Sequence, residues 1–379
     1  MGADFYDNRE QSQAKHEILK RYLVPFANKI LFTWRSIDFI DGFAGPWKNR
    51  DVDSLTDTSI GVALRTLSMV AEQRGHTLTD RRIRCVFNEQ DPQAYALLED
   101  FIERSRSNFP LLKINTFKGS FEDNARAIRR VTNHSFQLLF VDPTGHTGFP
   151  PSSLEYFNGR SSEIIVNFMR SFIERFVSGN HKDREKNLVE LVGEKRARYL
   201  LDTGLTIDTL EAEYLKMLRA DLRYKYAGFS PIHNPDKNQI HFNLAYATNH
   251  PDGMEVMRSA EFDALSDHDQ TRFKKIIRGR GGDLFEDMFD EIPVDGPYLT
   301  LRKSHERLAS AALSAAIPEG DKGLEFCKLA ANVQQELYLR RKELGDVLVE
   351  MADDGIIDRS WEQRKGRKPR KGDIIRKIS

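Results

Sequence analysis

Short apolar runs alternate with longer amphipathic stretches over the first half of the chain. The runs predict strands at residues 36–41, 83–88, 111–117, 136–141 and 163–168. Between them, apolar residues recur every three or four positions, which is typical of helices packed on one face. Such helices are predicted at residues 11–30 and 58–73. A third helix is predicted to begin at residue 92, and a fourth to end at about residue 131. Regular alternation of strand and helix predicts an α/β fold with a doubly wound parallel sheet.

The pattern changes twice after the fifth predicted strand. Two helices are predicted between residues 181 and 226, followed by β segments at 226–232 and 239–248 around a turn at 234–237. We expect this pair to be antiparallel and to close one edge of the sheet. From residue 296 the chain changes to compact helices with a basic end. We therefore expect a Rossmann-like domain over residues 1–295, with a helical insertion at about 178–226, and a winged-helix-like module over residues 296–379.

Composition restricts the class of protein. The 379 residues are enough for a large core, and 57 basic residues balance 57 acidic ones, so no global charge attracts nucleic acid or membrane. Charge is separated locally, because residues 261–295 are acidic and residues 359–379 are basic. Two distant cysteines exclude a disulfide framework, and ten scattered histidines without ligand spacing predict no metal site. No membrane span or signal peptide is recognised, so we expect a soluble, cytoplasmic protein.

Polar residues follow the predicted strands where a cofactor would bind. The first strand ends in Asp41-Gly42-Phe43-Ala44-Gly45-Pro46, and glycines in such a turn let backbone approach a ligand closely. Glu89 closes the second strand, where an acid can accept hydrogen bonds from a ribose. In open α/β sheets, cofactors lie at the carboxyl ends of strands. The candidate cofactor-binding residues are Asp41, Gly42, Phe43, Gly45, Glu89 and Ser120.

The spacing favours S-adenosylmethionine over NAD as the cofactor. A dinucleotide fingerprint requires G-x-G-x-x-G and an acid about 20 residues further on. Here the turn is G-F-A-G-P, and Glu89 lies much further along the chain. The structural alternative is that these glycines and acids only terminate strands, because glycine turns are common.

Asp142 and Pro143 are the candidate catalytic residues. The Asp142 carboxylate can accept a hydrogen bond from a nucleophilic amine, and Pro143 fixes a rigid turn. Amino-methyltransferases of nucleic acids use a related D/N-P-P-aromatic tetrad, whereas this chain continues with Thr144 and Gly145. The alternative, which the sequence supports equally well, is that Asp142 only caps a turn at the end of the strand. Lys15 and His16 on the first predicted helix could lie over the crevice, but a solvated helix face is the commoner fate of such residues and is expected here.

The carboxyl-terminal part suggests a second binding surface. A helix is predicted at residues 340–351, and Ile356-Ile357 and Ile374-Ile375 flank a basic loop. This is the order of a winged-helix module, whose wing contacts phosphates. The candidate nucleic-acid-binding residues are Arg364, Lys365, Arg367, Lys368, Arg370 and Lys371. The alternatives are a solvated charge run and a protein-docking wing.

Several motifs together resemble the three-Cys-motif partner proteins. They are the segment 38–46 with its Phe-Ala-Gly-Pro turn, Val141-Asp142-Pro143 with Gly145, Ile165-Val166-Asn167-Phe168, and the Thr-Asn-His segment within residues 244–253. The resemblance covers most of the chain. It implies a Rossmann-type methyltransferase and a partner with a three-cysteine motif that is similar to radical-SAM proteins. Trp47 replaces the glycine that ends the family's turn, so an indole would narrow the crevice, stack on a base or mark an altered use of the cofactor.

Three hypotheses follow. The first is an S-adenosylmethionine-dependent methyltransferase that acts on DNA or RNA. The second is a non-catalytic adaptor for a three-Cys-motif protein, in a setting such as phage defence. The third is a nucleic-acid-binding regulator in which the basic loop dominates.

Overall fold

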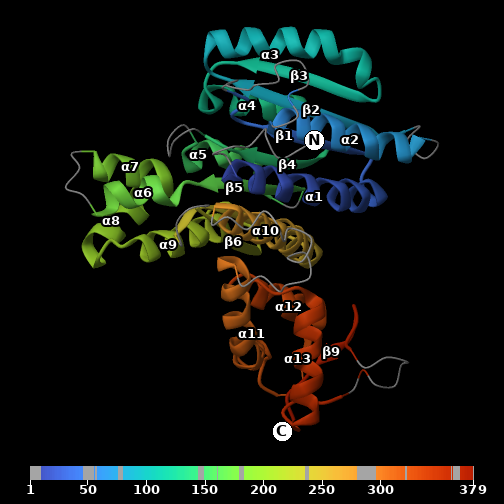
Figure 1. Ribbon diagram of the computed structural model, residues 1–379, viewed down its shortest axis with the longest axis vertical. Helices are drawn as coiled ribbons and strands as arrows, with labels where there is room; N and C mark the ends of the chain where they lie inside the picture. Colours follow the sequence, from blue (N-terminus) through green and yellow to red (C-terminus); the bar gives the residue numbers. More distant parts are fainter. Residues whose placement is uncertain are drawn as a thin grey trace.

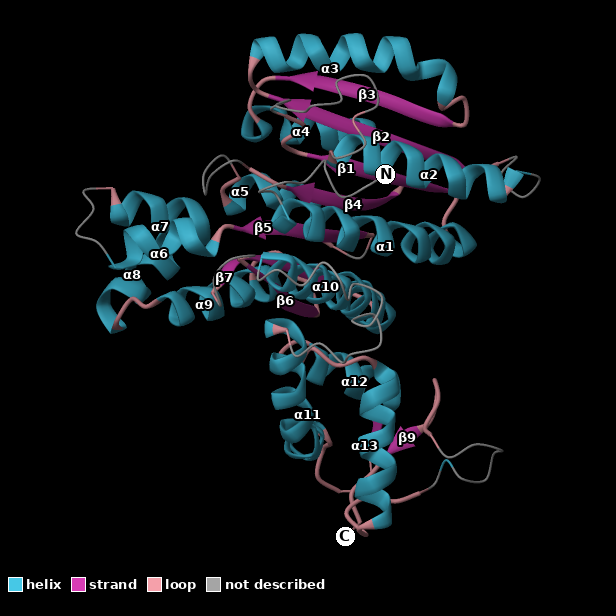
Figure 2. Ribbon diagram, in the orientation of Figure 1, coloured by secondary structure: helices cyan, strands magenta, loops and turns pink. Residues whose placement is uncertain are grey.

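One mixed sheet organises most of the molecule (Figures 1 and 2). The computed structural model describes residues 10–45, 55, 58–75, 80–143, 149–159, 161–178, 183–234, 239–279, 296–320, 322–359, 361 and 368–378. Within these residues, seven strands pair in the order β3-β2-β1-β4-β5-β7-β6. The strands are β1 (Ser36–Asp41), β2 (Arg82–Glu89), β3 (Leu112–Lys118), β4 (Phe136–Val141), β5 (Ser162–Phe168), β6 (Tyr226–His233) and β7 (Ile240–Thr248).

β1 to β5 have the order of a doubly wound α/β sheet, which β7 and β6 extend. β1 to β5 are parallel, whereas β7 runs antiparallel to both β5 and β6. The order reverses between β1 and β4, which makes their carboxyl ends the topological switch point of the sheet. The prediction of a doubly wound α/β sheet closed by an antiparallel pair is confirmed.

Successive side chains of the central strands point to opposite faces of the sheet, and this divides the core into two layers. Ile37 and Phe39 of β1 face one side of the sheet, and Ile40 faces the other. The first side is covered by α1 (Glu10–Thr33), α2 (Ser59–Gln73), α3 (Pro92–Ser105) and α10 (Pro251–Gly279). The second side is covered by α4 (Phe121–Val131), α5 (Pro151–Leu154) and the helices that follow β5. All six residues of β4 are buried, as its continuous apolar run predicts.

One prediction about the helices requires correction, and one long helix was not predicted at all. The insertion after α6 (Arg170–Ser178) contains three helices before residue 226, not two. They are α7 (Arg184–Val192), α8 (Glu194–Thr203) and α9 (Ile207–Ala220). Gly193 and Gly204 separate them, because both adopt a positive φ that interrupts a helix. The acidic stretch from residue 261 begins inside α10, a helix of 29 residues for which the sequence pattern gave no prediction.

The carboxyl-terminal helices have a small core of their own below the sheet (Figure 1). α11 (Pro297–Ala316), α12 (Phe326–Gln334) and α13 (Arg341–Asp353) enclose it. β9 (Ile374–Ile375) pairs with β8 (Leu324–Glu325), while Ile357 makes an isolated bridge with Lys377. The predicted boundary at 295/296 adjoins residues 280–295, which lie outside the described part of the chain. Among the described residues, no helix is long and apolar enough to cross a membrane.

Candidate functional site

Four polar side chains lie at the carboxyl ends of neighbouring strands. Glu89 ends β2, Asp41 ends β1, Asp142 follows β4 and Asn167 is the penultimate residue of β5; these strands are adjacent in that order. Asn167 Nδ2 donates to Asp142 Oδ1 at 2.7 Å, and the charges of Asp142 and Asp41 interact. The fold therefore brings together the two aspartates that were predicted from separate strand ends.

Asp41 is fully buried at the end of β1. Its Oδ2 accepts from the Ser59 hydroxyl at 2.6 Å, and its Oδ1 accepts from the Phe43 N–H at 3.0 Å. Burial raises the pKa of Asp41 to about 7, and the neighbouring charge of Asp142 adds to this rise against the two hydrogen bonds. Asp41 is thus a buried carboxyl group that titrates near neutral pH.

The turn after Asp41 is fixed by its neighbours. The Gly42 N–H donates to the Phe140 carbonyl at 2.9 Å, and the Ala44 N–H donates to the Asn88 carbonyl at 2.8 Å. A Cβ on Gly42 would lie 3.0 Å from the Phe121 ring, while the φ of Gly42 is not in the left-handed region. A side chain at this position would press on the aromatic ring beneath the turn, a reason for glycine that the sequence does not reveal.

Asp142 is held by two side chains, one of which was expected to be solvated. Lys15 Nζ donates to Asp142 Oδ2, and Lys15 and His16 are only 8% and 9% exposed. The prediction of a solvated face for these two residues is wrong. Lys15 lies three and four residues before Ile18 and Leu19, so the apolar stripe of the same helix was the available signal.

Asn167 is the residue that sequence reasoning missed. It lies within one of the resemblance motifs, but no role was assigned to it. Its Nδ2 orients Asp142, and its Oδ1 is buried without a hydrogen-bond partner among the described residues. A buried unpaired acceptor at a strand end is available to a ligand that carries N–H or O–H groups.

Glu89 and Ser120 lie where the sequence predicts them, and each has a local partner. Glu89 Oε1 accepts from the Asp91 N–H at 2.7 Å, and burial raises the pKa of Glu89. Ser120 caps α4, because its hydroxyl accepts from the Asp123 N–H at 3.1 Å and donates to Asp123 Oδ2 at 2.6 Å. Their assignment to a cofactor stays a prediction.

The basic loop is described only in part. Arg364, Lys365 and Arg367 lie outside the described residues, as do Trp47, Thr144 and Gly145. Lys368 forms an ion pair with Asp346 of α13, and Lys371 Nζ lies 3.2 Å from Asp252 Oδ2. These two lysines thus have carboxylate partners within the chain. In the described ranges, no group of three His, Cys, Asp or Glu residues forms a metal cluster.

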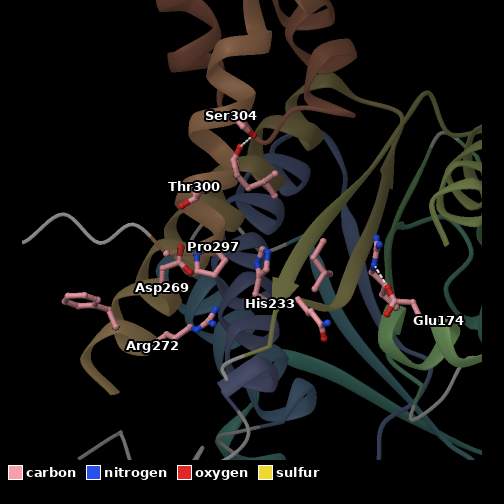
Figure 3. A pocket seen from close by; sticks show the side chains of 13 residues that line it. Glu174, His233, Asp269, Arg272, Pro297, Thr300 and Ser304 are labelled. Carbon is pink, nitrogen blue, oxygen red and sulfur yellow. Dashed lines mark hydrogen bonds and ion pairs between the residues drawn. The ribbon is translucent and has the colours of Figure 1, made fainter. Parts of the chain in front are cut away.

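A cavity of about 810 Å³ opens where β6 ends and β7 begins, at the same edge of the sheet as Asp142 (Figure 3). His233 lines it, and burial, assisted by the charges of Arg272 and His268, lowers the pKa of His233 to about 4. Two N–H groups of Arg272 are buried without partners among the described residues. The cavity therefore offers a cationic donor and a neutral imidazole.

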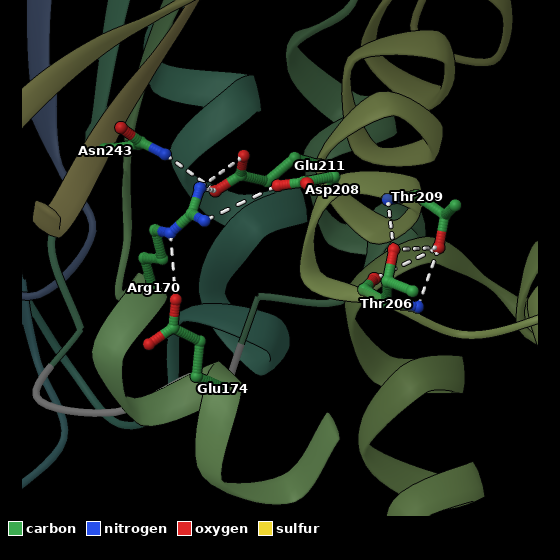
Figure 4. Close-up of polar contacts among 7 residues, drawn as sticks. All are labelled: Arg170, Glu174, Thr206, Asp208, Thr209, Glu211 and Asn243. Atoms are coloured by element: carbon green, nitrogen blue, oxygen red, sulfur yellow. Dashed lines mark hydrogen bonds and ion pairs between the residues drawn. The ribbon is translucent and has the colours of Figure 1, made fainter. Parts of the chain in front are cut away.

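The helices beside this cavity are joined by an arginine (Figure 4). Arg170 Nη1 donates to both carboxylate oxygens of Glu211 at 2.8 Å, and Arg170 Nε donates to Glu174 at 3.0 Å. Asn243 of β7 also donates to Glu211 at 2.8 Å. The network fixes α6 and α9 to the sheet just after Asn167.

Comparison with known proteins adds little to this geometry. No family model matches the chain, and no curated protein matches its sequence. One solved structure that resembles it is a loganic acid methyltransferase with SAH, which is 10% identical. That match covers 79% of this chain and 89% of the other chain, with a TM-score of 0.30. A likeness this distant carries no functional argument, so the three-Cys-motif resemblance stays a prediction.

Proposed function

We propose that the protein is an S-adenosylmethionine-dependent methyltransferase. The observation that carries the proposal is the meeting of Asp41, Asp142 and Asn167 at the switch point of the sheet. Ligands of open α/β sheets bind at this point, outside the carboxyl ends of the strands. The acids there suit a cofactor that carries a sulfonium and an ammonium group.

The residues of β1 and β2 would hold the cofactor. Asp41 and the backbone of Gly42, Phe43 and Gly45 form the first wall, and Glu89 offers an acceptor for ribose hydroxyls. Ser120 lies on the same side, at the start of α4. When bound, S-adenosylmethionine supplies a methyl group that is already activated for transfer.

Asp142, Pro143 and Asn167 would position the methyl acceptor. A carboxylate oxygen can accept more than one hydrogen bond, so Asp142 retains capacity beside Lys15 and Asn167. Asn167 Oδ1 supplies a second acceptor. Two acceptors at one strand end suit the N–H groups of an amine and would align its lone pair for in-line transfer.

We propose nucleic acid as the acceptor. Arg272 lines the 810 Å³ cavity, and two of its N–H groups have no partner among the described residues, which suits a phosphate. The basic loop would add phosphate contacts, and the element order α11, β8, α12, α13 and β9 supports a winged-helix reading of this region. Lys368 and Lys371 already pair with Asp346 and Asp252. They can bind a phosphate only if it replaces these carboxylates as their partner.

The test is calorimetric binding of S-adenosylmethionine, followed by transfer of labelled methyl groups to DNA and RNA. Asp41→Asn should weaken cofactor binding strongly. Asp38→Asn is the matched control, because Asp38 is also buried on β1 but hydrogen-bonds to Ser135 at the opposite edge. Absence of binding at millimolar cofactor would refute the proposal, as would equal effects of the two variants.

A non-catalytic adaptor is the second candidate. The observation in its favour is that both oxygens of Asp142 already have partners, Lys15 and Asn167. Such an adaptor would use the old crevice as a scaffold for a three-Cys-motif protein. An Asp142→Ala protein that keeps full biological activity supports this role, whereas an inactive variant that still binds its partner argues for catalysis.

A further inference from the structure

A second large cavity lies at the edge of the sheet opposite the proposed cofactor crevice. It has a volume of about 930 Å³, within the usual range for small-molecule sites. Trp34 precedes β1, Phe136 opens β4, Ser162 opens β5 and Thr248 ends the antiparallel β7. These positions all belong to the amino-terminal edge of the parallel strands. The cavity is therefore separate from Asp41 and Asp142.

One wall of this amino-edge cavity is aromatic. Phe136 packs against both Phe26 and Trp34, with ring centroids 5.8 Å and 5.6 Å apart. Phe32 at the lip is 78% exposed, which is unusual for so large an apolar side chain. A wall of this kind suits a planar ring, because aromatic groups gain from stacked or edge-on contact beyond simple burial.

The floor of the cavity is polar and rigid. Glu163 accepts hydrogen bonds from the hydroxyls of Tyr22 and of Thr248, the latter at 2.6 Å. Gly253 closes over this group, since a Cβ there would lie 2.7 Å from Glu163 Oε1. The Tyr246 hydroxyl also hydrogen-bonds to Glu163, which is only 3% exposed, so this carboxylate fixes the residues beneath the cavity.

The mouth is positively charged. Three of the described residues that line the cavity are lysines, Lys29, Lys225 and Lys371. The acid beside them is Asp252, whose Oδ2 lies 3.9 Å from Lys29 Nζ. Arg341 donates to Asp252 at 2.6 Å, and Lys371 lies 3.2 Å from it. These cations lower the pKa of Asp252 to about 2, although burial opposes the shift. Asp252 thus neutralises only part of the surrounding charge, which leaves an attractive field for an anion.

We propose that the amino-edge cavity binds a nucleoside monophosphate. The base would lie against Phe26, Trp34 and Phe136, and the phosphate at Lys29 and Lys371. The volume exceeds what a single aromatic ring needs. Lys29 and Lys371, which lie 3.9 Å and 3.2 Å from Asp252, are close enough to each other to share a phosphate. The ligand is a free nucleotide or the 5′-terminal nucleotide of an oligonucleotide, which present the same chemistry.

A ligand in this cavity would also contact two parts of the chain that are far apart in the sequence. Lys371 follows the basic loop, whereas Lys29 belongs to α1 and Asp252 to α10. A phosphate at the mouth would bridge Lys29 and Lys371. Bound nucleotide should therefore fix the carboxyl-terminal segment against the sheet domain.

The test is calorimetric titration of the full chain with AMP and GMP, beside guanosine and inorganic phosphate. A 5′-phosphorylated trinucleotide distinguishes the oligonucleotide end from the free nucleotide. Lys29→Glu should weaken nucleotide binding about tenfold or more, and Lys371→Gln should weaken it as well. Lys20→Glu is the matched control, because Lys20 lies on the same helix, is similarly exposed and pairs with Glu17 away from the cavity.

Glu89→Ala separates this site from the proposed cofactor crevice. Nucleotide binding that survives Glu89→Ala and falls in Lys29→Glu supports the proposal, whether or not the protein binds S-adenosylmethionine. Binding that is lost in Glu89→Ala and unchanged in Lys29→Glu overturns it, as does no binding at millimolar nucleotide.

Tryptophan fluorescence supplies an independent measurement of the base position. The chain has three tryptophans, of which Trp34 would contact the base. The change in tryptophan fluorescence on nucleotide binding should therefore disappear in Trp34→Phe, while calorimetric binding persists. A change that remains in Trp34→Phe contradicts placement of the base against this wall.

Discussion

Replacing Asp41 with asparagine should make the protein more stable at neutral and alkaline pH. Burial raises the pKa of Asp41 from 3.8 to about 7. Between these values the folded state binds more protons than the unfolded state, so the free energy of unfolding falls as pH rises. Asparagine keeps the shape and a hydrogen-bonding oxygen, yet it does not ionise.

The size of the effect follows from linkage. The stability advantage of Asp41→Asn over the wild type should grow by about 2.5 kcal/mol from about pH 5 to about pH 8. Urea denaturation of both proteins across this range measures it. In Asp38→Asn most of the growth should occur below about pH 6, because the pKa of Asp38 is raised to about 6, again mainly by burial. An advantage for Asp41→Asn that does not vary with pH would show that Asp41 is already ionised, and the reasoning would fail.

Three further predictions concern buried contacts. Lys15→Met should reduce stability by about 2–4 kcal/mol because it leaves Asp142 without its cation, and adding Asp142→Asn should restore part of the loss in denaturant titrations. Gly253→Ala should cost about 1–3 kcal/mol, since its Cβ would meet the Tyr246 hydroxyl at 2.5 Å. Gly75→Ala meets no atom within 4 Å, and a thermal melt should show little change. Arg258→Met should lower stability by about 3–5 kcal/mol because the buried guanidinium binds Glu261 and the Gln334 carbonyl; an unchanged melt would contradict this.

The sheet was largely predictable from the sequence. The bounds of β1 and β4 agree with the prediction, because buried central strands are continuous apolar runs that end abruptly in polar residues. Those ends also revealed Asp41 and Asp142. Helix boundaries in the insertion were less clear, since Gly193 interrupts a stretch that otherwise reads as one helix.

The contacts of the candidate site were not predictable from local pattern. Lys15 and Asp142 are 127 residues apart, and nothing near either residue indicates the pairing. Asn167 reads as part of a buried strand, so its unpaired oxygen appears only once β5 lies beside β4. Gly42 was predicted to admit a ligand, whereas its neighbour in the fold is Phe121. In each case the sequence identified the residue or its strand, but the partner comes from tertiary packing.

The packing of α1 on α10 has a consequence for folding during synthesis. The first helix of the chain contacts a helix that begins at Pro251, and Arg21 Nη2 lies 2.6 Å from Asp267 Oδ2 across this contact. Contacts between such distant segments form late, because a long loop must close first. On the ribosome, α2 and β1 can already pack on α1, but the part of α1 that faces α10 stays uncovered until α10 emerges. Since Lys15 lies on α1, a nascent chain that ends before α10 would hold the cation of Asp142 on a helix whose packing is incomplete.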